Sequence, residues 1–275
     1  MYERYWQLDS NPFENDADPK AFFRSETHQA ALLKLRYLIE NRKGVGLVAG
    51  GTGLGKSYLT RMLARQMDEQ CRPWVNLVFP QMAPAELLAY LAVELGADPQ
   101  VVGSETGGLD RTVREIERML KMHNEQDVHP VVIVDEAHLI EDLQVFQALR
   151  LLLNFQRNQH HQFTLVFIGQ RELLQTVRRL GQLEERLSVK CLLRPLTDAE
   201  TAEYVDCRLK AAGADRQIFD EAALQSIYEL SAGVPRRINR LCDLALLVGF
   251  ADESAVISAD QVEAVAEEMT TVPVE

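Results

Sequence analysis

The segment "GGTGLGKS" at positions 50–57 constrains the fold of this chain more than any other feature of its sequence. It matches the pattern G-x-x-x-x-G-K-[ST], in which glycines allow consecutive backbone N–H groups to face a phosphate. The residues "VGLVA" at 45–49 read as a short buried strand, and the residues after the loop read as a helix. A match by chance has no reason to fall between a strand and a helix, so we expect a nucleotide-binding α/β fold.

The residues of this loop have separate expected roles. Lys56 is expected to contact the β and γ phosphates, and the Ser57 hydroxyl is expected to bind Mg²⁺. The amino terminus of the following helix adds a partial positive charge to the same place. The residues that we expect to contact the nucleotide are Gly51, Thr52, Gly53, Leu54, Gly55, Lys56, Ser57 and Tyr58.

A second motif, "VVIVDEAH" at 131–138, supplies two carboxylates. Its first four residues form the β-branched run that is typical of a parallel strand covered on both faces. At the end of that strand Asp135 is expected to hold Mg²⁺ together with Ser57, and Glu136 is expected to orient and deprotonate a water. An acid beside the Mg²⁺ ligand favours hydrolysis by water over transfer to a bound small acceptor.

Strands and helices are expected to alternate through the first two thirds of the chain. The expected strands are 45–49, 74–79, 131–134, 163–169 and 188–193. The expected helices are 27–43, 55–70, 84–95, 107–124, about 141–157 and one that starts at 170. This order predicts a parallel five-stranded sheet between helices, joined by right-handed crossovers.

The strands stop at Pro195, which marks the expected domain boundary. Thr197 and Glu200 have the spacing of a capping box, in which the two residues cap the start of a helix. This helix is expected to be the first of about four that end near residue 269. We therefore expect an α/β nucleotide-binding domain at 1–194 and a small all-helical domain at 195–275.

The composition of the chain limits the binding partners and the cellular compartment that we expect. Lys and Arg number 29 against 41 Asp and Glu, and the resulting net charge of −12 opposes broad attraction to nucleic acid or anionic lipid. The four cysteines form no C-x-x-C pair and fit the reduced thiols of a cytoplasmic protein. No apolar run reaches the roughly 18 residues needed to cross a bilayer. The adjacent His160 and His161 have no third ligand nearby in sequence, so we expect a solvated loop there instead of a metal site.

Longer segments of the chain resemble the AAA+ ATPases of the ExeA/GspA type from general secretion pathways, to which transposition regulators of the TniB/TnsC kind are related. Besides the two motifs, the resemblance rests on "YWQLDSNPFENDADPKAFFRSETHQAALLKL", "LRLLLNF", "FIGQREL", "RLSVKCLLRPLTDAETAEYVDCRLKAAG" and "GVPRRINRLCDLAL". It implies a P-loop AAA+ sheet followed by a helical lid domain, with ATP and Mg²⁺ as cofactors and ATP hydrolysis to ADP and phosphate as the reaction.

The resemblance also implies roles for single residues. Gln170 resembles sensor 1, an amide that holds the attacking water, although a helix-capping role explains it equally well. Arg186 resembles the arginine finger that a subunit offers to the ATP of its neighbour, with Arg178 and Arg179 as rivals. Arg236, in "GVPR", resembles sensor 2, which reaches from the lid to the γ-phosphate.

Three further residues keep two interpretations each. Pro12 and Phe13 resemble the N-terminal segment that covers the adenine, but "NPF" also fits plain packing against the helix at 27–43. Asn76 resembles the switch residue that holds Glu136 away from the water, but an asparagine at a strand end is often a turn residue.

The resemblance implies a homo-oligomeric ring or filament that drives or regulates assembly of a secretion or pilus-type machine, in the cytoplasm or at the inner face of the cell membrane through protein partners. The alternatives are a DNA-binding transposition regulator and a scaffold that binds ATP without hydrolysing it. Glu136 and Arg186 argue against the scaffold. Relatives of the secretion type usually continue into a membrane span and a peptidoglycan-binding part, whereas this sequence stops at Glu275. We therefore expect either the cytoplasmic part of such a protein or a stand-alone ATPase with another client.

Overall fold

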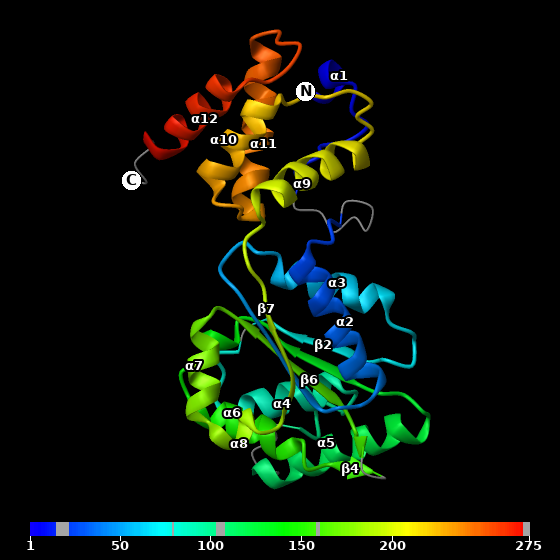
Figure 1. Ribbon diagram of the computed structural model, residues 1–275. Coiled ribbons are helices and arrows are strands. Elements are labelled where there is room, and N and C mark those ends of the chain that lie inside the picture. The colour runs from blue at the N-terminus through cyan, green and yellow to red at the C-terminus, as the bar shows by residue number, and fades with distance from the viewer. Residues whose placement is uncertain (15–21, 79, 103–107, 158–159, 272–275) are drawn as a thin grey trace. The chain divides into compact units, whose positions relative to one another are not determined.

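The computed structural model describes residues 1–14, 22–78, 80–102, 108–157 and 160–271 (Figure 1). Residue 79 of the strand expected at 74–79, residue 107 of the helix expected at 107–124 and the last four residues of the chain lie outside this part. Contacts divide the chain into two compact units. The sheet unit comprises Thr27–Gly51 and Leu59–Leu193, and the helical unit comprises Met1–Glu26, Thr52–Tyr58 and Arg194–Glu275.

The sheet unit contains the five-stranded parallel sheet that the sequence predicts. Its strands are β1 (Val45–Ala49), β2 (Trp74–Leu77), β3 (Val131–Val134), β6 (Thr164–Gly169) and β7 (Leu187–Leu192). They lie in the order β2-β3-β6-β1-β7, and every neighbouring pair is parallel. Since β6 lies between β1 and β3, the strands that precede the two motifs flank it.

Helices lie before and between these strands in the chain. They are α2 (Glu26–Glu40), α3 (Lys56–Gln66), α4 (Pro84–Glu94), α5 (Gly108–Glu125), α6 (Leu143–Leu152), α7 (Glu172–Arg179) and α8 (Gly181–Glu184), with a short 3₁₀ helix η2 (Ala137–Leu139) after β3. The first residue of α2 and the first three of α3 belong to the helical unit. No helix in the described part of the chain is both long enough and apolar enough to cross a membrane.

Both faces of the three central strands, β3, β6 and β1, are buried, as is typical of a parallel sheet. Leu47 and Phe167 share one apolar cluster with Phe146 of α6, and the rings of Phe146 and Phe167 lie 5.3 Å apart. The other face of β1 contacts α2, because a Cβ added at Gly46 would lie 2.6 Å from Leu38 Cδ2. Gly46 therefore lets α2 pack closely on the sheet.

The segment after α6 differs from the prediction of a helix through residue 157. The helix ends at Leu152, and an antiparallel pair follows, β4 (Gln156–Arg157) and β5 (His160–His161). The expectation that His160 and His161 lie in a loop was therefore wrong. His161 Nδ1 lies 3.1 Å from the Leu153 carbonyl oxygen. Strands of two residues are too short to show a period in sequence.

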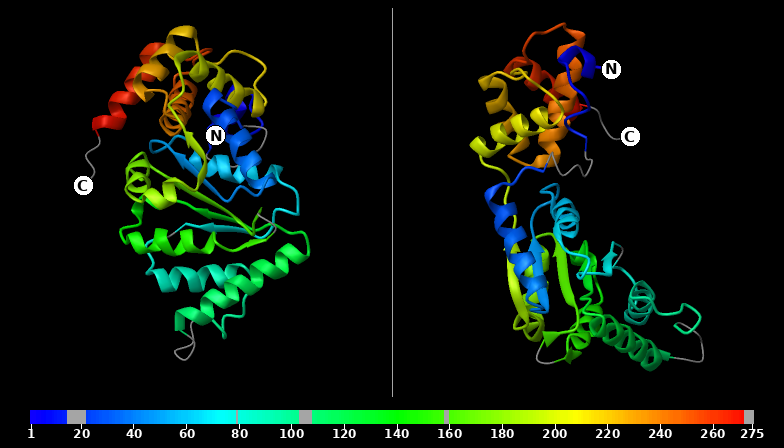
Figure 2. Two further views of the ribbon diagram at one scale, coloured as in Figure 1. Left: turned by 60° about the horizontal axis from the view of Figure 1, so that its bottom comes forward. Right: turned by 90° about the vertical axis from the view of Figure 1, so that its right-hand side faces the viewer.

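The helical unit holds the four helices expected after Pro195 and also the N-terminal segment (Figure 2). Its helices are α1 (Glu3–Trp6), α9 (Asp198–Ala211), α10 (Glu221–Ser231), α11 (Pro235–Ala251) and α12 (Ala259–Thr271). Trp6 is fully buried, and its Nε1 donates to the Leu246 carbonyl oxygen at 2.9 Å. The N-terminal residues thus group with the helical unit, which differs from the predicted domain at 1–194.

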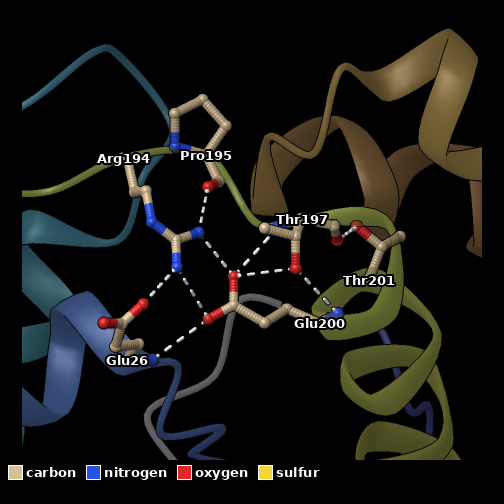
Figure 3. A network of polar contacts seen from close by, with 6 residues as sticks. All are labelled: Glu26, Arg194, Pro195, Thr197, Glu200 and Thr201. Atoms are coloured by element: carbon tan, nitrogen blue, oxygen red, sulfur yellow. Dashed lines mark hydrogen bonds and ion pairs between the residues drawn. The ribbon is translucent and has the colours of Figure 1, made fainter.

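The predicted capping box opens α9 and is part of a larger polar network (Figure 3). Glu200 N donates to Thr197 Oγ1 at 3.2 Å, and Glu200 Oε2 accepts from Thr197 N at 2.9 Å and from Arg194 Nη1 at 2.6 Å. Arg194 also pairs with Glu26 at 2.7 Å. Burial raises the pKa of Glu200, but the bonds from Arg194 and the backbone outweigh it and leave the pKa below its ordinary value.

Gly233, between α10 and α11, provides a test of this packing. Its φ is +67°, and a Cβ there would lie 2.0 Å from the Leu196 carbonyl oxygen. We expect Gly233→Ala to lower the free energy of unfolding by about 2 kcal/mol or more, because the strained φ adds to a backbone clash. Urea unfolding measures this. Gly181→Ala is the matched control, since a Cβ there meets no atom within 4 Å. An equal effect of both changes would contradict this account.

Candidate functional site

The loop between β1 and α3 has the backbone that the phosphate-loop motif demands. Gly53 and Gly55 have φ values of 79° and 81°, which residues other than glycine rarely adopt. Gly50 N donates to the Gly169 carbonyl oxygen at 3.2 Å, which ties the start of the loop to the end of β6. Lys56 is the first residue of α3 and is buried. The loop therefore ends at a helix amino terminus, which favours a bound phosphate.

Arg236, expected as sensor 2, lies against the same loop within the helical unit. Arg236 N donates to the Gly53 carbonyl oxygen at 3.3 Å, and a Cβ at Gly53 would lie 3.0 Å from Arg236 Cβ and from Val234 Cγ1. The Arg236 side chain is exposed. The start of α11 thus packs on Gly53 and brings one arginine beside the phosphate loop.

The two acids of the second motif differ in environment. Asp135 follows β3 and is buried, and its Oδ1 accepts from Glu136 N at 2.8 Å. Glu136 has a left-handed backbone with φ of 49°, and 41% of its side chain is exposed. A buried carboxylate suits a Mg²⁺ ligand, because this ion prefers oxygen donors. An accessible carboxylate suits a group that acts on water.

Three predicted site residues follow neighbouring parallel strands. Gly50 follows β1, Asp135 follows β3, and Gln170 follows β6, which lies between them. Carboxyl ends of parallel strands meet at one edge of a sheet, where ligands of open α/β sheets bind. Arg171 is the N-cap residue of α7 and makes no side-chain capping bond, and both interpretations of Gln170 remain predictions.

Arg186 lies at the opposite edge of the sheet, directly before β7. Its Nη2 donates to Asn154 Oδ1 at 2.7 Å, and its Nη1 donates to the Arg150 carbonyl oxygen at 3.4 Å. Burial lowers the pKa of the nearby His161, and the Arg186 charge acts in the same direction. Because β7 runs parallel to β1 and spans roughly 20 Å at 3.3 Å per residue, Arg186 is too far from the carboxyl edge to reach it.

The rival arginines lie in the last turn of α7. Arg178 and Arg179 are exposed there, where cations interact favourably with the helix dipole. Arg179 also lines a cavity of about 330 Å³, whose other lining residues are Phe146, Gln147, Arg150, Leu180, Gly181, Gln182 and Leu183. These positions leave the choice among the three arginines a prediction.

The structure shows which residues surround Pro12, Phe13 and Asn76, each of which has two interpretations. Phe13 is buried and packs edge-on against Phe219 at 6.5 Å, while the Pro12 carbonyl oxygen accepts from Arg208 Nε at 2.6 Å. Both residues therefore pack within the helical unit, and their contact with an adenine remains a prediction. Asn76 lies inside β2 with an exposed side chain, and its proposed switch role also remains a prediction.

Two residues that contact predicted functional residues had no role in our sequence interpretation. His138 is the last residue of the quoted "DEAH" and lies in η2, with its Nδ1 3.4 Å from Glu136 Oε2. Asn154 belongs to the quoted "LRLLLNF" and holds Arg186. The only sequence signal for His138 is its place two residues after Glu136 in the motif. Nothing in the sequence links Asn154 to Arg186.

Solved structures with this fold include the ORC2 protein of Aeropyrum pernix, with a TM-score of 0.70 and 16% identity over 97% of this chain and 73% of that one. The Holliday junction branch migration motor RuvB of Thermotoga maritima has a TM-score of 0.61 and 20% identity over 93% of this chain and 73% of its own. These likenesses establish the fold that the sequence predicts.

Comparison of the sequence with known proteins identifies a relative and a family. General secretion pathway protein A of Aeromonas hydrophila is 34% identical over 254 residues, which are 91% of this chain and 45% of that protein. The present chain thus spans less than half of the relative's length. A family model described as an AAA domain matches residues 39–177, which include the phosphate loop and the acidic motif. The chain therefore belongs to the AAA domain family.

Proposed function

We propose that this protein is a Mg²⁺-dependent ATPase that works as a homo-oligomer and drives or regulates the assembly of a secretion or pilus-type envelope machine. The observation that carries the proposal is the 34% identity to general secretion pathway protein A across 91% of the chain. The proposal places the protein in the cytoplasm or, through protein partners, at the inner face of the cell membrane.

The residues of the two motifs fit the cofactors. The phosphate-loop N–H groups and Lys56 would bind the β and γ phosphates, and the Ser57 and Asp135 oxygens would hold Mg²⁺, which neutralises phosphate charge when bound. Glu136 would accept the proton of the attacking water, and the Gln170 amide would orient that water. Arg236, beside Gly53, would stabilise the γ-phosphate.

The proposed oligomer follows from the position of Arg186. One subunit cannot bring this guanidinium to the carboxyl edge of its own sheet, because the length of β7 separates them. If Arg186 completes an ATP site, that site belongs to a neighbouring subunit in a ring or a filament. Asn154 and the Arg150 carbonyl oxygen would hold that arginine in place.

A DNA-binding transposition regulator is the alternative that the sequence resemblance suggested. The net charge of −12 opposes duplex binding at physiological salt. The likeness to origin-recognition and branch-migration proteins, at 16% and 20% identity, concerns the fold alone. The secretion-type proposal is therefore favoured, and ATP-dependent coating of DNA at 150 mM salt would reverse that order.

The nucleotide site is tested by Lys56→Ala. We expect ATP affinity to fall by about 10- to 150-fold, because a charged hydrogen-bonding partner of phosphate contributes about 1.5–3 kcal/mol. Titration with a fluorescent ATP analogue, with and without Mg²⁺, measures the change. Lys121→Ala, on the exposed face of α5, is the matched control and should bind ATP as the wild type does. Wild-type affinity in Lys56→Ala would refute the assigned site.

A further inference from the structure

His138 has an unusual relation to the carboxylate that we propose as the base. Its Nδ1 lies 3.4 Å from Glu136 Oε2, close enough for an ion pair but beyond the usual length of a hydrogen bond. The same nitrogen is buried and makes no hydrogen bond within the described part of the chain. A buried polar atom without a partner in a native protein requires an explanation, and a functional role is one of the accepted ones.

A structural explanation of His138 is the first alternative. His129 also has a buried Nδ1 without a hydrogen bond, while its Nε2 lies 2.9 Å from Thr164 Oγ1, and burial lowers its pKa to about 3. Burial thus keeps His129 a neutral histidine of the core. His138 differs because its Nδ1 lies 3.4 Å from a carboxylate oxygen of Glu136.

The backbone holds the imidazole ring in this position. Glu136 is the N-cap residue of η2 in a left-handed conformation, and its carbonyl oxygen accepts from Leu139 N at 2.9 Å. On the other side, a Cβ added at Gly169 would lie 3.1 Å from His138 N and 3.3 Å from Nδ1. The ring therefore packs against the last residue of β6, directly before Gln170. It connects the proposed base to the strand that carries the proposed sensor.

We propose that His138 is a positioning residue for Glu136, and this inference rests on the proposed role of Glu136 as the base. A shift of about 0.5 Å would bring Nδ1–H to hydrogen-bonding distance of Oε2. The bond would fix the rotamer of a side chain that is 41% exposed and otherwise free to turn toward solvent. A carboxylate has two oxygens, so Oε2 can accept from His138 while Oε1 faces the water.

The test compares ATP turnover of the full chain with His138 replaced by alanine, asparagine or glutamine. We expect His138→Ala to lower kcat by about 10- to 100-fold with unchanged ATP affinity, because misplacing a reacting group by about 1 Å has an effect of this size. The amide nitrogen of asparagine occupies the place of Nδ1, whereas that of glutamine occupies the place of Nε2. His138→Asn should therefore regain most of the lost kcat, and His138→Gln should not.

Controls separate this inference from the proposed function. His160→Ala, an exposed histidine of β5, should leave kcat unchanged. In single-turnover assays, adding His138→Ala to Glu136→Gln should lower the rate no further, since His138 acts through Glu136. Wild-type or raised kcat in His138→Ala, equal kcat in the three variants, or additive effects with Glu136→Gln would overturn the inference. If Glu136→Gln itself keeps wild-type turnover, the proposed base fails instead.

Discussion

Replacing Arg186 with alanine is expected to lower kcat for ATP hydrolysis by about 10³- to 10⁵-fold while leaving ATP affinity within a few-fold of the wild type. Arginines supplied by a partner to other P-loop enzymes have effects of this size, because they meet charge that develops only in the transition state. The guanidinium donates to Asn154 Oδ1 at an exposed position, where water can replace the lost bond, so the variant is expected to fold. Steady-state turnover and fluorescent ATP titration measure the two quantities.

A control variant and variants of the two other candidate arginines make this prediction specific to Arg186. Arg114→Ala removes an exposed arginine of α5 that pairs with Asp110, one turn away, and should leave kcat unchanged. Arg178→Ala and Arg179→Ala should have small effects if Arg186 is the finger. Wild-type kcat in Arg186→Ala together with a large loss in either α7 variant would move the finger to the end of α7.

The second large effect is expected from Glu136→Gln, which should lower kcat by about 10²- to 10⁴-fold, the usual contribution of a general base. Glutamine keeps the size of the side chain but cannot accept the proton of the attacking water. ATP should therefore still bind and remain unhydrolysed. Rapid quench and nucleotide retention after gel filtration measure turnover and trapped ATP.

A carboxylate of similar exposure elsewhere provides the matched control for Glu136. Glu184 of α8 pairs with Lys190 at 2.7 Å and has a side chain that is 33% exposed, and Glu184→Gln should turn over ATP at the wild-type rate. Equal ATP turnover in wild type and Glu136→Gln would remove Glu136 from the proposed role and leave the acidic motif with Mg²⁺ binding alone.

Features with strong local signals could be predicted from the sequence. The phosphate loop needs glycines at particular backbone angles, and Gly53 and Gly55 have them. The apolar run 131–134 is a strand buried on both faces. The capping box at Thr197 forms as expected, because both of its bonds connect residues three apart.

Features that depend on distant contacts could not be predicted. The N-terminal segment groups with the helical unit because Trp6 inserts among residues some 240 positions later in the chain. The early end of α6 follows from a pair of two-residue strands that carry no periodic signal. The separation of Arg186 from the carboxyl edge required the strand order, in which β7 pairs with β1. The contact between His138 and Glu136 depends on one left-handed residue.

The central claim is that each ATP site is completed by a neighbouring subunit. Mixing Arg186→Ala with Lys56→Ala, at an ATP concentration too low for Lys56→Ala to bind ATP, tests it most directly. Arg186→Ala keeps Lys56, and Lys56→Ala keeps Arg186, so a mixed oligomer contains pockets with an intact loop that face an intact arginine. We predict that the mixture regains a substantial part of wild-type ATP turnover. Arg186→Ala mixed with the double variant Lys56→Ala/Arg186→Ala should stay inactive, because no subunit then supplies the arginine. A mixture of the two single variants that co-assembles and remains inactive would contradict the shared site.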